Sequence, residues 1–84
     1  MTIKEKLKRL ILEDLRLVEF TQDDLGDDDL LFGPKFGLDS IDAIEVVHLL
    51  KKNFGVEIKD MNEGRPALQS INTLCAFIEA KQSN

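Results

Sequence analysis

The chain has 84 residues, of which 43% are hydrophobic and 32% are charged, a composition typical of one globular domain and not of a disordered tail. Its formal charge of −5 argues against nucleic-acid binding, which requires a basic surface, and favours partners that carry positive patches. The single cysteine, Cys75, excludes an internal disulfide framework and a zinc site built from cysteines. The sequence shows neither a signal peptide nor an apolar run long enough to cross a membrane. We therefore expect a cytoplasmic protein with one domain over residues 1–84.

The first predicted element is a helix from about Ile3 to Leu17. Thr2 followed by Glu5 fits a capping box, in which each side chain accepts a hydrogen bond from a free amide at the helix start. Apolar residues then recur at helical spacing and predict one buried stripe, which consists of Ile3, Leu7, Leu10, Ile11 and Val18.

Residues 19–39 lack helical periodicity and contain three glycines, a proline and six aspartates, five of which lie between positions 23 and 29. A loop of this length is uncommon in a compact domain and is usually functional. The aspartates between positions 23 and 29 do not have the ligand spacing of a calcium-binding helix–loop–helix, so no metal site is predicted. We expect an ordered loop held to the core by its apolar residues, Leu30, Leu31, Phe32, Phe36 and Leu38.

The second helix is predicted to run from Ser40 to Asn53 or Phe54, with Asp39 as N-cap and Gly55 just after its end. A helical projection places one apolar arc against the core: Ala43, Val46, Val47, Leu50 and Phe54.

Other residues of the second helix point away from that arc, namely Ile41, Ile44 and His48, flanked by Asp42 and Glu45. Two interpretations fit them. Isolated apolar side chains are common on protein surfaces, whereas apolar side chains ringed by carboxylates beside a hydroxyl are typical of a small docking face.

The C-terminal part is predicted to contain one short helical turn and one longer helix. Asp60 and Glu63 would cap the turn, which Gly64 and Pro66 are expected to interrupt. The last helix is predicted over roughly Thr73 to Lys81, with Asn72 or Thr73 as its cap. Its buried stripe consists of Ile71, Leu74, Cys75 and Ile78. The predicted fold class is all-α: a small antiparallel helical bundle with three main helices, one short helix and a long ordered loop between the first two.

Ser40 lies at the start of the second helix, where free amides and the positive end of the helix dipole favour an attached phosphate. Hydrolytic catalysis by this serine is not expected. His48 is the only histidine, and it lies about two helical turns away, too far to orient an imidazole onto the hydroxyl.

The run Gly37-Leu38-Asp39-Ser40-Ile41-Asp42 resembles the attachment region of acyl carrier proteins. The resemblance continues through residues 54–58 and 71–74 and covers nearly the whole chain. It implies that a separate phosphopantetheinyl transferase attaches a 4′-phosphopantetheine arm from coenzyme A to Ser40. The chain would then carry acyl groups as thioesters for fatty-acid or related lipid and secondary-metabolite synthesis, as a monomer with no catalytic residues of its own.

The resemblance also implies how partners are recognised. Acyl-loading, elongating and acyl-transfer enzymes would bring basic docking patches to an acidic and apolar surface made of Asp39, Ile41, Asp42, Ile44, Glu45 and His48. An acyl chain folding back between the helices would meet Val47. The family more often has an apolar residue at the position of His48, and acidic residues where Lys51 and Lys52 stand. These differences leave open both the general fatty-acid carrier and a specialised carrier that serves a dedicated set of enzymes. A carrier of aminoacyl or polyketide groups, and an unmodified acidic interaction module, are the alternatives.

Overall fold

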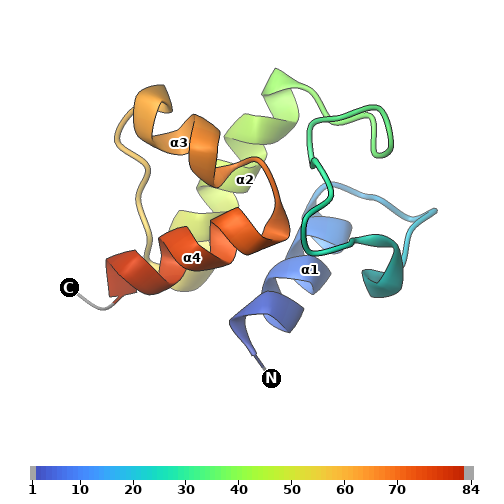
Figure 1. The fold of residues 1–84 in the computed structure, drawn as a ribbon, viewed down its shortest axis with the longest axis horizontal. Coiled ribbons are helices and arrows are strands. Elements are labelled where there is room, and N and C mark those ends of the chain that lie inside the picture. Colours follow the sequence, from blue (N-terminus) through green and yellow to red (C-terminus); the bar gives the residue numbers. More distant parts are fainter. Residues whose placement is uncertain (1, 83–84) are drawn as a thin grey trace.

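The computed structural model describes residues 2–82, which form four α-helices and one short 3-10 helix. These are α1 (Ile3–Asp14), η1 (Gln22–Asp24), α2 (Ser40–Phe54), α3 (Met61–Ala67) and α4 (Ile71–Gln82). Figure 1 shows α1, α2 and α4 around a common centre, with the short α3 packed beside α4 and the loop between α1 and α2 at the right of the view. The all-α class with three main helices is thereby confirmed. Within the described residues, no helix has the length and apolar character needed to span a membrane.

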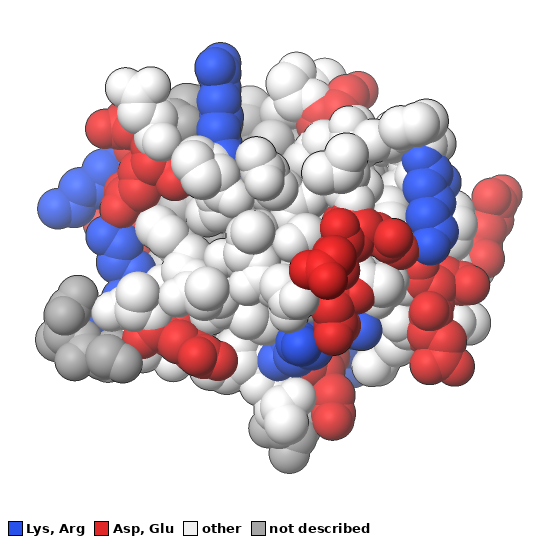
Figure 2. All heavy atoms as spheres, in the orientation of Figure 1, with Lys and Arg blue, Asp and Glu red and all other residues white. Residues whose placement is uncertain are grey.

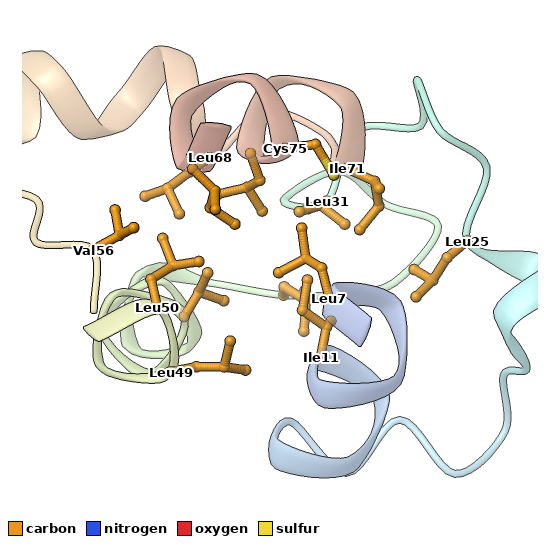
Figure 3. Packing of buried hydrophobic residues seen from close by; sticks show 14 of the residues in the cluster. Leu7, Ile11, Leu25, Leu31, Leu49, Leu50, Val56, Leu68, Ile71 and Cys75 are labelled. Carbon is orange, nitrogen blue, oxygen red and sulfur yellow. The ribbon is translucent and has the colours of Figure 1, made fainter. Parts of the chain in front are cut away.

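The core is built by side chains that meet between α1, α2 and α4 (Figure 3). Each of the following is at most 2% exposed: Leu7, Ile11, Val46, Leu49, Leu50, Ile71, Leu74 and Ile78. The buried stripe predicted for the last helix is confirmed, whereas Leu49 lies outside the arc predicted for α2. Because α2 packs against α1 as well as the rest of the core, its buried face is wider than a single stripe.

Helix α2 begins and ends where the sequence predicts. The Asp39 side chain caps its first turn, and Gly55 follows its last residue with a φ of 66°. This left-handed conformation costs glycine little because it has no Cβ. Local signals therefore define both ends of the helix that carries Ser40.

Helix α1 starts as predicted but ends three residues early. The Glu5 N–H donates to the Thr2 Oγ1 over 3.1 Å, while at the other end Arg16 has a φ of 55° and turns the chain out of the helix. The prediction that Val18 belongs to the buried stripe is wrong, because its side chain is 89% exposed.

Helix α3 continues through the proline that was expected to interrupt it. Hydrogen bonds from the Gly64 N–H to the Asp60 carbonyl oxygen (3.0 Å) and from the Leu68 N–H to the Gly64 carbonyl oxygen (2.8 Å) are made on either side of Pro66. In a helix of seven residues, the proline removes a single backbone donor.

Helix α4 begins at Ile71, two residues before the predicted start. Its cap is Ser70: the Thr73 N–H donates to the Ser70 Oγ over 3.2 Å, and the Ser70 N–H donates to the Thr73 Oγ1 over 2.8 Å. This reciprocal arrangement is a capping box with Thr73 in the first turn. The Asn72 side chain, one of the predicted caps, instead donates to the Asp28 carboxylate over 2.8 Å.

The long loop packs on the core with apolar side chains and is tied to α1 and α4 by polar ones. Leu31 is fully buried, but Leu30 is 62% exposed, so its prediction as a core residue is wrong, and Leu25, only 1% exposed, takes an unpredicted core position. Lys4 and Lys8 of α1 each place their Nζ 2.9 Å from the Asp27 carboxylate. The loop is therefore ordered by contacts with both ends of the chain.

The ion pairs of Asp27 with Lys4 and Lys8 predict a loss of stability in acid. Hydrogen bonds from Lys8 and Lys4 hold the pKa of the Asp27 carboxyl below its ordinary value. A carboxyl whose pKa is lowered by folding stabilises the protein above the pKa of the unfolded chain, about 3.9, and this contribution is lost as the pH falls through the folded pKa. Urea midpoints should therefore be level from about pH 6 to 5 and fall below about pH 4. Asp27→Asn should lower the midpoint at neutral pH and reduce its fall in acid, whereas an unchanged fall would contradict this role of Asp27.

Candidate functional site

The start of α2 is held by two aspartates that cap each other's backbone. The Ile41 and Asp42 N–H groups donate to the Asp39 Oδ1 over 3.0 and 3.3 Å, and the Asp39 N–H donates to the Asp42 Oδ2 over 3.0 Å. Gly37, with a φ of 66°, lets the chain turn just before this box. Ser40 lies between the two aspartates and its side chain is exposed. The sequence thus presents one hydroxyl on a rigid helix start.

The capping box changes the electrostatic expectation for Ser40. Asp39, the predicted N-cap, already occupies two of the helix-start amides, so these donors are not free to bind a phosphate. The helix dipole still favours an anion at this end, but two carboxylates stand beside it. The start of α2 is therefore a weaker anion site than the dipole alone would make it.

A cavity of about 440 Å³ opens beside Ser40. The start of α2, the long loop and the segment around α3 enclose it. Its apolar lining is Leu30, Phe32, Leu38, Ala43 and Leu68, and its polar lining is Asp39, Ser40, Arg65 and Gln69. This volume lies in the lower range of small-molecule pockets. A flexible arm attached to the hydroxyl, or the apolar chain that it bears, fits such a lining.

Val47, which the family resemblance implied would meet a carried acyl chain, does not line this cavity. It lies instead in a separate groove of about 240 Å³ with Ile44, Ile58, Lys59 and Asp60. Apart from Asp39 and Ser40, the residues that line the Ser40 cavity were not identified as site residues from the sequence. In the sequence, Leu30 and Phe32 were expected to hold the loop to the core. The folded loop brings them to the start of α2.

The predicted docking residues are brought together on the N-terminal half of α2. Ile41 and Ile44 are 67% and 70% exposed, and Glu45 and His48 are also exposed. Asp42 is half-buried, and its carboxylate serves the capping box together with that of Asp39. The exposed isoleucines therefore form an unpartnered apolar strip, bordered by acids at the Ser40 end.

Other reactive groups lie away from this site. The Cys75 thiol is buried in the core, and burial raises its pKa, which keeps the thiol protonated. Figure 2 shows acidic side chains gathered over the long loop. Among the described residues, no set of three or more histidine, cysteine or carboxylate side chains is placed to hold a metal ion. Ser40 is thus the candidate group that combines exposure, a fixed position and an adjoining cavity.

Comparison with known proteins agrees with this geometry. An acyl carrier protein from Solidesulfovibrio magneticus is 33% identical over 84 residues, which cover 98% of this chain and 97% of that protein. An acyl carrier protein from Akkermansia muciniphila is 32% identical over 81 residues, 96% of this chain and 94% of its own length. The solution structure of a holo acyl carrier protein from Nitrosomonas europaea superposes with a TM-score of 0.80 over the whole of both chains, at 24% identity, which shows the shared fold.

A family model described as the phosphopantetheine attachment site matches residues 5–78. This match includes the start of α2 and the cavity beside it. Together with the two relatives, it shows that the chain belongs to the acyl carrier proteins, non-catalytic carriers with a phosphopantetheine attachment site.

Proposed function

We propose that Ser40 is the residue to which the phosphopantetheine arm is attached. The observation that carries this proposal is the exposed Ser40 hydroxyl at the capped start of α2, beside an apolar cavity and inside the matched region. The other described serine, Ser70, is only 5% exposed, and its hydroxyl is engaged in capping α4. Ser40 is therefore the described serine that a modifying enzyme could reach.

The work of this chain is to present a carried group and not to react with it. When bound, the arm supplies a thiol that holds acyl groups as thioesters. The aspartates of the capping box hold the attachment point in place. The carried group can bind in the apolar cavity beside Ser40 and leave it when a partner enzyme binds. The transferase supplies the base and metal for attachment, since Ser40 has no oriented imidazole to activate it.

Intact-mass spectrometry tests the proposal. The purified apo protein is incubated with coenzyme A and a phosphopantetheinyl transferase of broad specificity. We expect the mass of one arm to be added. A folded protein that gains no mass would contradict the proposal, and that result is also the one expected of an unmodified interaction module.

We propose that the exposed face of α2 docks the transferase and the acyl-loading, elongating and acyl-transfer enzymes. Ile41 and Ile44 would fill apolar pockets, and Glu45 would face basic residues of the partner. His48 lies farther along the same face, in a polar groove with Glu45 and Lys52. Lys52 reverses the charge at this end of the groove, so the acidic part of the docking face lies nearer to Ser40. The cytoplasmic location expected from the sequence stays a prediction.

A pair of charge reversals tests this docking surface. Glu45→Lys places a cation where the partner is expected to present its own cations and should slow arm transfer about tenfold, mainly through slower association. Lys52→Glu reverses a charge more distant from Ser40 and should slow transfer by about twofold or less. Initial rates measured at low and at physiological salt report the effect, which should shrink as salt screens it. Equal rates for the two variants would place the docking surface elsewhere.

A further inference from the structure

Arg65 of α3 is the one cation in the lining of the cavity beside Ser40. Its side chain is exposed and thus lies at the mouth, where the apolar lining meets solvent. Every ion pair within residues 2–82 uses a lysine as its cation: Lys4, Lys8, Lys35, Lys51 or Lys81. Arg65 therefore has no carboxylate partner in the described part of the chain.

The one acid in the lining of this cavity does not form an ion pair with Arg65. Asp39 lines the same cavity, but its Oδ1 accepts hydrogen bonds from two α2 amides, and it lies beyond ion-pair distance from Arg65. A guanidinium beside an apolar surface binds best to two coplanar anionic oxygens, as in a carboxylate or a phosphate. The cavity thus combines an apolar wall with one guanidinium, that of Arg65, whose N–H donors have no carboxylate partner among the described residues.

We infer that Arg65 binds an oxyanion of the group that Ser40 carries, an inference that rests on the proposed attachment at Ser40. Two parts of that group offer the required chemistry. One is the phosphodiester at the base of the arm. The other is a carboxylate on the acyl cargo, in which case Arg65 would select acyl chains that end in an acid over plain fatty acyl chains.

Two measurements on modified protein distinguish these sources. The transferase loads wild type, Arg65→Gln, Arg65→Lys and Lys59→Gln from coenzyme A, hexanoyl coenzyme A or adipoyl coenzyme A, so that the two cargoes have the same carbon chain with and without a terminal carboxylate. Lys59 lines the neighbouring groove and not this cavity, so Lys59→Gln controls for the loss of one positive charge. The ³¹P resonance of the protein bearing the arm alone reports the phosphodiester, and thioester cleavage by hydroxylamine reports how well each cargo is sheltered.

If Arg65 binds the cargo, Arg65→Gln should speed cleavage of the adipoyl thioester about threefold, as expected from loss of an ion pair at a partly exposed site, and leave the hexanoyl thioester unchanged. If Arg65 binds the phosphodiester, Arg65→Gln should shift the ³¹P resonance and change the cleavage rates of the adipoyl and hexanoyl thioesters by the same factor. Arg65→Lys, which keeps the charge without the fork, should give a smaller change in either case. The inference is overturned if Arg65→Gln matches Lys59→Gln in the resonance and in both cleavage rates. Failure of attachment at Ser40 would appear earlier, as wild-type protein without added mass.

Discussion

Ser40→Ala is expected to abolish attachment of the phosphopantetheine arm, with no mass gain under conditions that modify wild type completely. The acceptor oxygen is removed, and no other described serine is both exposed and at a helix start. The fold should be unaffected, because the cap of α2 is made by Asp39 and Asp42 and not by the Ser40 side chain. The free energy of unfolding should therefore change by no more than about 0.5 kcal/mol, the range of neutral surface substitutions.

Ser70→Ala is the matched control, since both serines stand at the start of a helix. Ser70 is buried, and its hydroxyl accepts the Thr73 N–H, so its loss should cost about 1 kcal/mol of unfolding free energy. Arm attachment should proceed at the wild-type rate. The two variants should thus separate modification from stability. Residual mass gain in Ser40→Ala would assign the arm to another residue.

Local signals allowed the start and end of α2 to be predicted from the sequence. Asp39 and Gly55 act on the backbone within a few residues of themselves, through capping and through a left-handed φ. Helical periodicity likewise predicted that Ile41 and Ile44 would be exposed, because the position of a side chain around a helix depends only on its place in that helix. The proposed attachment residue and the proposed docking face both lie on this well-specified element.

The cavity beside Ser40 could not be predicted in the same way. Its wall combines loop residues with Leu68 and Arg65 from the segment around α3, and no periodic pattern relates these positions. Leu30 and Leu31 are adjacent in a loop, where hydrophobicity alone does not say which one is buried. Contacts distant in sequence decide it: the Leu31 N–H donates to the Gln69 carbonyl oxygen over 2.9 Å, while Leu30 faces the cavity. Arg65 became a candidate only after this wall was known.

Leu7→Ala is expected to cause the largest loss of stability. The Leu7 side chain is fully buried in the cluster between α1, α2 and α4 (Figure 3), and truncating a buried leucine costs about 3 kcal/mol through lost transfer free energy and the cavity that remains. A domain of this length has about 5–10 kcal/mol in total. Urea unfolding followed by far-UV circular dichroism should show a midpoint near half that of wild type, with the slope unchanged.

Val18→Ala is the control that distinguishes burial from periodicity. Hydrophobic spacing places Val18 on the same stripe as Leu7, but the left-handed turn at Arg16 carries it out of α1, and the side chain is 89% exposed. Its truncation should cost no more than about 0.5 kcal/mol. A loss similar to that of Leu7→Ala would mean that α1 continues past Asp14 and buries Val18. In that case the loop would start later, and its residues Leu30 and Phe32 would line the cavity beside Ser40 in a different arrangement.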